Sequence, residues 1–135
     1  MIGLIIITHG NLAIELKSSL EHIIGPQKNL ETISIGYEDD VNKKKDEIKE
    51  LINKVDTGKG VILLTDMFGN TPSNLVISLI EENKIEMIGG VNLPLLVKLG
   101  SIRNETEMKD LIEASVEAGH KYIGVATEIL SKEEK

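Results

Sequence analysis

His9 is the residue whose type and position best suit it for chemistry. It comes two residues after the end of an apolar run, Ile2 to Ile7, and a helical pattern begins just beyond it. In open α/β sheets, strand ends that lead into helices are where ligands and reacting groups gather. An imidazole there can accept a phosphoryl group if one ring nitrogen is free and a partner holds the proton on the other. We therefore predict that His9 is a catalytic residue.

Asp66 is the predicted partner of His9. It follows a second apolar run, Val61 to Thr65, and precedes a turn and another helical pattern. If the two strands are neighbours, the Asp66 carboxylate can reach the imidazole, select its tautomer and stabilise the positive charge that develops on the ring. The alternative is that His9 merely caps the helix that follows it.

The turn after Asp66 carries the groups predicted to bind phosphate. Its backbone N–H groups and the Thr71 hydroxyl would face outward at the start of a helix, whose dipole favours an anion. Pro72 has no N–H to donate, so the amides of the next residues would complete the cradle. An ordinary strand-to-helix turn would have a similar sequence. The predicted phosphate-binding residues are Gly69, Asn70, Thr71 and Ser73.

Other polar residues fit structural roles better. His22 lies near the end of a predicted helix, and His120 follows the Gly119 stop. The basic run at residues 43–45 is flanked by acidic residues and is typical of a solvated helix face, with a basic binding patch as the alternative. Nothing matches a nucleotide-binding glycine motif.

Composition excludes several classes of function. The chain of 135 residues fits one domain, 1–135, and contains no cysteine, which excludes disulfides and thiol catalysis. A net charge of −7 argues against nucleic-acid binding. No apolar stretch approaches the roughly 20 residues that span a bilayer, and the N-terminal run lacks the features of a signal peptide. We expect a cytoplasmic protein without direct membrane insertion, and a mechanism that needs no metal or cofactor.

Strand and helix patterns alternate along the chain, which indicates an α/β fold with a mostly parallel sheet covered on both faces. Helical spacing is expected over residues 12–24, from about 40 to 55, from 71 to 80, in a short segment after Pro94, and from about 106 to 119. Gly25-Pro26 would end the first helix, and Thr71-Pro72 would supply an N-cap and a first-turn proline. Strands are expected at residues 2–7, 30–35, 61–65, 85–90 and 122–126, with a frayed charged tail from Ser131.

Three segments together resemble the mannose/fructose-type IIA proteins of the bacterial phosphoenolpyruvate-dependent sugar phosphotransferase system. They are residues 5–10 (IIITHG), 64–72 (LTDMFGNTP) and 90–96 (GVNLPLL). They occur in the family's order, and the resemblance extends over nearly the whole chain.

The resemblance implies a phosphocarrier with a flavodoxin-like three-layer α/β/α sandwich of strand order 2-1-3-4. Phosphate would pass from phospho-HPr to His9 and then to a IIB component, which serves a IIC/IID membrane permease. Asp66 matches the residue that hydrogen-bonds the histidine, and Thr71 matches the hydroxyl residue near the phosphoryl group. The family is usually a homodimer that exchanges an antiparallel last strand, which would be residues 122–126 here.

One position departs from the family pattern. Many members have Gly-Gly before the Ser/Thr-Pro, whereas this chain has Gly69-Asn70. Asparagine tolerates positive φ, so we expect the turn to survive.

Several other classes of protein share some of these features. A response-regulator receiver would need an acidic pair after the first strand, and a chelatase-type enzyme would need further metal ligands at strand ends. The phosphocarrier subunit of a phosphoenolpyruvate-dependent dihydroxyacetone kinase shares the chemistry and is the closest rival. A regulatory protein controlled by phosphorylation of His9 stays open, and the sequence does not name the sugar.

Overall fold

A four-stranded parallel sheet lies at the centre of the protein. The computed structural model describes residues 1–133, and its strands are ordered β2-β1-β3-β4. This confirms the predicted order. The strands are β1 (Gly3–His9), β2 (Leu30–Ile35), β3 (Val61–Thr65) and β4 (Ile85–Gly89).

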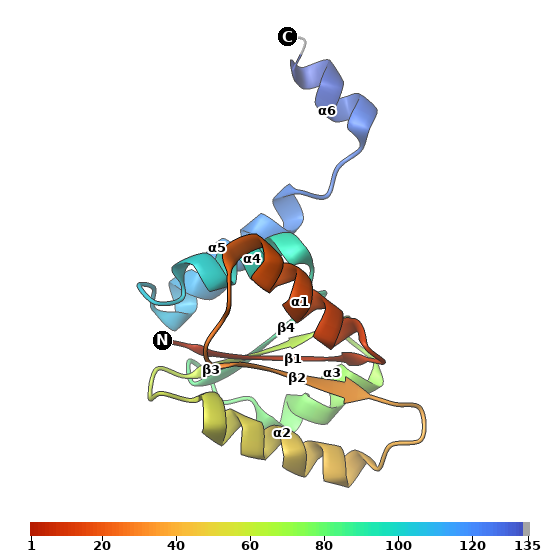
Figure 1. Ribbon diagram of the computed structural model, residues 1–135, viewed down its shortest axis with the longest axis vertical. Coiled ribbons are helices and arrows are strands. Elements are labelled where there is room, and N and C mark those ends of the chain that lie inside the picture. Colours follow the sequence, from red (N-terminus) through yellow and green to blue (C-terminus); the bar gives the residue numbers. More distant parts are fainter. Residues whose placement is uncertain (134–135) are drawn as a thin grey trace.

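Helices cover both faces of the sheet and form a three-layer α/β/α sandwich (Figure 1). On one face lie α1 (Leu12–Ile24), α4 (Leu93–Ile102) and α5 (Met108–Lys121). On the other lie α2 (Val41–Val55) and α3 (Thr71–Val76), which continues into the short 3₁₀ helix η1 (Ile77–Leu79). The predicted fold class is confirmed.

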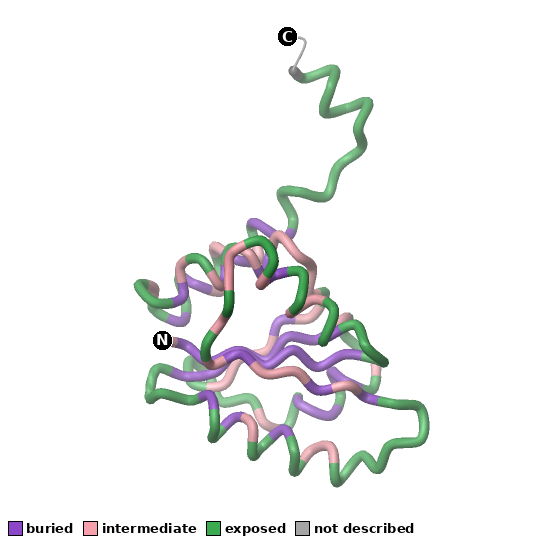
Figure 2. Tube along the Cα trace, viewed as in Figure 1, coloured by how far each residue is buried: buried purple, intermediate pink, exposed green. Residues whose placement is uncertain are grey.

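The core forms on both sides of the central strands, because alternate side chains of a strand point to opposite faces. Leu4 and Ile6 pack beneath α1 and α4, whereas Ile5 and Ile7 pack against α2 and α3. Figure 2 shows buried residues running along the strands and the inner helix faces. The continuous apolar run in β3 is therefore explained by burial on both faces.

Most helix boundaries follow the local signals, but α5 continues past the predicted Gly119 stop to Lys121, and the N-cap of α3 differs from the predicted one. α1 ends at Gly25, whose φ is 92°, and the Asp40 side chain caps α2. The predicted N-cap of α3 was Thr71, but the observed cap is Asn70, whose side chain accepts from the Ser73 N–H. The cap is shifted because the Asn70 amide oxygen reaches that donor, and Thr71 becomes the first residue of the helix.

The chain after α5 differs from the prediction. Residues 122–125 are exposed and form neither helix nor strand in the single chain, and α6 (Ala126–Glu133) follows where a strand end and a frayed tail were expected. In Figure 1 this segment projects away from the sandwich. A strand that pairs only with a second chain has no partner in one chain, so strand exchange in a dimer stays a prediction.

Arg103 ties the amino end of the sheet together. It is 3 % exposed, and its guanidinium bonds four acceptors, the carbonyls of Ile2, Lys28 and Asn29 and the side chain of Gln27. Burial lowers the pKa of Arg103 to about 10, so it stays protonated at neutral pH. The sequence analysis gave this residue no role.

No helix within residues 1–133 combines the length and apolar character needed to cross a bilayer.

Candidate functional site

His9 and Asp66 meet at the carboxyl ends of the two central strands. β1 and β3 are hydrogen-bonded neighbours, and Ile7 pairs with Thr65 in their register. His9 and Asp66 are therefore side by side just beyond this pair. The chain leaves β1 toward β2 on one side and returns to β3 on the other, which makes this the point where α/β sheets of this order bind ligands.

The imidazole is fixed by one nitrogen and free at the other. His9 Nδ1 lies 2.9 Å from Asp66 Oδ2, and the same carboxylate oxygen accepts from the His9 backbone N–H at 3.1 Å. The His9 side chain is 56 % exposed, and its Nε2 makes no hydrogen bond to any of residues 1–133. A proton on Nδ1 is held by the carboxylate, which leaves the lone pair of Nε2 available for an electrophile.

Asp66 is itself held by its own loop. Its other oxygen, Oδ1, accepts from the Met67 N–H at 3.1 Å and from the Asn70 side-chain amide. Burial by itself would raise the pKa of Asp66, but the hydrogen bonds from the His9 backbone, the Asn70 amide and the His9 ring outweigh it and lower the pKa below 3.8. The carboxylate is consequently charged at neutral pH and oriented toward His9.

Asn70 has two tasks that the sequence analysis did not assign to it. Its amide nitrogen donates to Asp66, and its amide oxygen caps α3. Its φ is −94°, whereas Gly69 has a φ of 83°. The expectation that asparagine would have to tolerate positive φ is therefore wrong, because the preceding glycine takes the left-handed conformation.

The predicted phosphate cradle is only partly free. The N–H of Gly69 donates to Ser73 Oγ at 3.0 Å, and the N–H of Ser73 donates to Asn70 at 3.0 Å. The Asn74 N–H is also used, by the Asn70 carbonyl. Within residues 1–133, the N–H groups of Asn70 and Thr71 have no hydrogen-bond acceptor. Gly69 and Ser73 thus shape the turn, while Asn70 and Thr71 keep donors available.

The Thr8 side chain connects the end of β1, next to His9, to the start of α1. Its buried hydroxyl accepts from the Ala13 N–H at 2.7 Å, which satisfies one of the free donors at the start of α1. The helix cap residue Asn11 makes no such side-chain bond. A polar residue at the end of an otherwise apolar strand was the available signal for this role.

Exposed apolar side chains follow both His9 and Asp66 along the chain. Met67 and Phe68 follow Asp66 and are 59 % and 61 % exposed, and Leu12 opens α1 with 45 % exposure. One face of the Phe68 ring lies against the end of β4, since a Cβ placed on Gly89 would come within 2.5 Å of that ring. This apolar rim is a surface on which another protein could exclude water.

The remaining candidates lie elsewhere. His22 falls in the last turn of α1 and His120 in the last turn of α5, and no hydrogen bond joins either to His9 or Asp66 among the described residues. Within residues 1–133, no three His, Cys, Asp or Glu side chains lie close enough together to hold a metal ion.

Comparisons with known proteins agree on one family. Residues 3–116 match the family described as PTS system fructose IIA component. The PTS system fructose-specific EIIA component of Bacillus subtilis (strain 168) is 31 % identical over 133 residues, covering 98 % of this chain and 91 % of that protein. The PTS system mannose-specific EIIAB component of Escherichia coli (strain K12) is 30 % identical over 90 % of this chain, which spans 38 % of that longer protein.

A solved structure supports the same relationship. The crystal structure of phosphotransferase system component EIIA from Streptococcus agalactiae superposes with a TM-score of 0.86 at 27 % identity, covering 95 % of this chain and 99 % of that one.

Proposed function

Since the chain belongs to the mannose/fructose-type IIA family and is a phosphocarrier component of a sugar phosphotransferase system, we propose that His9 is the residue that carries the phosphoryl group. The observation that supports this most is the state of its two nitrogens. Nδ1 is held by Asp66 at 2.9 Å, and Nε2 is the exposed, unbonded nitrogen. The phosphoryl group would therefore be attached to Nε2.

The proposed transfer needs no group beyond two histidines. The Nε2 lone pair of His9 attacks the phosphorus of the donor phosphohistidine in line, a new N–P bond forms, and the donor's N–P bond breaks with its electron pair returning to the donor imidazole. Positive charge then spreads over the His9 ring, where the Asp66 carboxylate stabilises it through the Nδ1 proton. Passing the group to an acceptor histidine reverses these steps.

The start of α3 would bind the phosphoryl oxygens. The free N–H groups of Asn70 and Thr71 and the exposed Thr71 hydroxyl are the donors suited to this task. Gly69 and Ser73 would contribute by fixing the turn, not by direct contact.

Two protein partners follow from this role. HPr would supply the phosphoryl group and a IIB component would receive it, and through IIB the group would reach a sugar at the IIC/IID permease. The apolar rim of Leu12, Met67 and Phe68 would exclude water from the transfer and limit hydrolysis of the phosphohistidine. We also propose that residues 1–135 act as one IIA domain in the cytoplasm.

A homodimer is part of the proposal. The segment after α5 exposes Tyr122, Ile123, Ile129 and Leu130, and a second chain would cover apolar surface that one chain leaves in water. Sedimentation analysis would test this, and a monomer at micromolar concentration would contradict it.

The decisive test is intact-mass spectrometry after incubation with phosphoenolpyruvate, enzyme I and HPr. The wild type should gain the mass of one phosphoryl group, and His9→Ala should gain none. His22→Ala and His120→Ala are matched controls and should be phosphorylated like the wild type. An adduct that persists in His9→Ala would place the phosphoryl group on another residue.

A further inference from the structure

A cavity of about 270 Å³ opens beside His9, and none of the apolar-rim residues lines it. Its walls come from the loop between β2 and α2, the first turn of α2 and the start of α3. Residues lining it include His9, Tyr37, Asp39, Lys44, Thr71 and Leu75. It therefore adjoins both His9 and Thr71.

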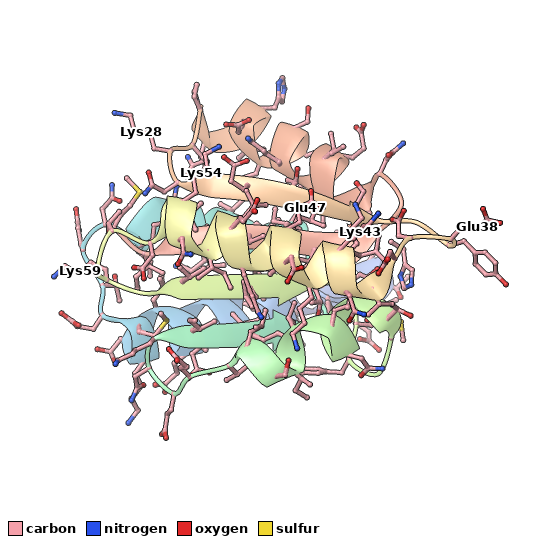
Figure 3. All side chains as sticks on the ribbon, turned by 90° about the horizontal axis from the view of Figure 1, so that it is seen from below. Lys28, Glu38, Lys43, Glu47, Lys54 and Lys59 are labelled. Atoms are coloured by element: carbon pink, nitrogen blue, oxygen red, sulfur yellow. The ribbon has the colours of Figure 1, made fainter. Side chains whose placement is uncertain are left out.

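Lys44 brings positive charge to this cavity. Of the residues among 1–133 that line it, Lys44 is the only one with a permanently cationic side chain. Its side chain is 24 % exposed, so most of its length packs against the protein. Its neighbour Lys43 is exposed and lies on α2 at the end nearer Glu38 (Figure 3).

The ammonium has acidic neighbours but no close partner. Lys44 Nζ lies 3.4 Å from Glu47 and 3.8 Å from Asp39, both longer than the 2.7–2.9 Å typical of a strong charge-assisted hydrogen bond. The Asp39 carboxylate is also occupied by the Gly36 N–H. Lys44 is thus held near the cavity by weak ion pairs that a stronger anion could displace.

A phosphoryl group on His9 would be such an anion. It carries a charge of roughly −1.5 to −2 at neutral pH and offers three strong acceptor oxygens. The carboxylate of Asp66, which bonds His9, and that of Asp39, which lines the same cavity, would both repel it, while the turn at Asn70 offers neutral donors. The turn at Asn70 consequently binds the phosphoryl oxygens without supplying a cation to balance their negative charge.

We propose that Lys44 is a phosphoryl-binding residue, which moves from Asp39 and Glu47 to the phosphoryl oxygens when His9 is loaded. This rests on the proposed function of His9. It adds no covalent step, because the N–P bond forms as described above and Lys44 only binds the oxygens. Its effect is to stabilise the loaded state and to favour acceptance of the group from the donor.

The competing explanation is that Lys44 only fastens the loop after β2 through Asp39. A fastening role would change the stability of the protein, whereas a phosphoryl-binding role changes the titration of the phosphoryl group itself. Phosphorylating the protein in two ways distinguishes these two roles, and it also distinguishes both from a role in contacting HPr. One is the relay from phosphoenolpyruvate, and the other is direct phosphorylation by potassium phosphoramidate, which presents no protein surface.

The test compares wild type, Lys44→Gln, Lys44→Arg and the matched control Lys43→Gln. After phosphoramidate loading, ³¹P NMR should show the phosphoryl group of Lys44→Gln retaining its proton to higher pH than in wild type, because the ammonium favours the dianion. In the relay, the equilibrium share of phosphoryl groups on Lys44→Gln relative to HPr should fall about tenfold, as expected for one charge-assisted contact. Lys44→Arg should recover most of both effects, and Lys43→Gln should match the wild type.

A second variant should act in the opposite direction. Asp39→Asn keeps an acceptor for the Gly36 N–H but removes the charge that competes for Lys44. It should raise the share of phosphoryl groups on the protein by a few fold. This result is independent of any loss of stability in Lys44→Gln.

Three outcomes would overturn the proposal that Lys44 binds the phosphoryl group. If Lys44→Gln matches Lys43→Gln in both the titration and the relay, the proposal fails while phosphorylation of His9 stands. If only the relay changes, Lys44 contacts HPr instead and the proposal fails. If the wild type is not phosphorylated, or His9→Ala is phosphorylated equally, both this proposal and the proposed function fail.

Discussion

The two ends of the sheet use their polar groups in opposite ways. At the amino end, Arg103 is buried and donates to four acceptors around the start of β1. At the carboxyl end, His9 is exposed, bonded through one nitrogen and free at the other. A side chain whose hydrogen-bonding atoms all have partners can only stabilise the fold. A side chain that is held in place but keeps one atom free can also react. Stabilising and reactive polar groups thus lie at opposite ends of the strands of one sheet.

Arg103→Leu should have the largest effect and should act on the fold alone. Four acceptors lose a cationic donor, and hydrogen bonds to charged groups contribute about 1.5–3 kcal/mol each without being additive. We expect a loss of about 3–5 kcal/mol in the free energy of unfolding, measured by urea denaturation. Phosphorylation of the folded fraction should be unchanged. A loss below about 1 kcal/mol would mean that water replaces the guanidinium and that the amino end is not locked as described.

Asp66→Asn should have the next largest effect, and it should act mainly on the chemistry. An amide cannot stabilise the charged ring as a carboxylate does, so transfer from HPr should slow by about 10²-fold or more, measured by rapid-quench phosphorylation. The matched control is Asp56→Asn at the amino end, where the carboxylate accepts from Gly58 and Gly60. That variant should transfer at the wild-type rate. Equal rates for Asp66→Asn and Asp56→Asn would show that Asp66 does not assist His9.

The contact between His9 and Asp66 was predictable because it depends on strand order and register alone. Two apolar runs of the right length in an alternating α/β pattern make adjacent parallel strands, and parallel strands present their carboxyl ends at one edge. The role of Arg103 was not predictable in this way. Three of its four acceptors are backbone carbonyls far along the chain, and a carbonyl has no signature in the sequence.

Asn70 and the segment after α5 show two further limits. The sequence analysis judged Asn70 by its backbone preferences, but its side chain decides its role, through a cap on α3 and a bond to Asp66. Residues 122–126 have the composition of a strand and yet form none in one chain. Strand formation depends on a partner edge, which local composition does not supply.

Asn70→Ala should have a moderate effect on both properties, because the residue belongs to the fold and the site at once. Loss of the α3 cap should cost about 1 kcal/mol of unfolding free energy, and loss of a donor should raise the pKa of Asp66 toward its ordinary value. Asn92→Ala is the matched control, since Asn92 caps α4 by accepting from the Leu95 N–H at 3.0 Å. Both variants should lose similar stability in urea, but only Asn70→Ala should slow transfer. Equal transfer rates for Asn70→Ala and Asn92→Ala would show that the Asn70 side chain does not assist the transfer.

The smallest expected effect is a dependence of stability on pH. Because the pKa of Asp66 is lowered in the folded state, its contribution is fully present above the ordinary value of 3.8 and is lost as pH falls through the folded value. Urea denaturation between about pH 5 and pH 2 should show a shallower loss for Asp66→Asn than for wild type. Parallel curves would mean that Asp66 has the same pKa in the folded and unfolded protein.

The absence of a side chain at Gly89 makes room for Phe68, which belongs to the loop that orients the histidine. Any added carbon would strike the Phe68 ring, and Phe68 lies two residues beyond Asp66 in the same loop. An alanine at the end of β4 would therefore force the Phe68 ring to shift. The end of β4 thus leaves room for the Phe68 ring only while position 89 carries no side chain.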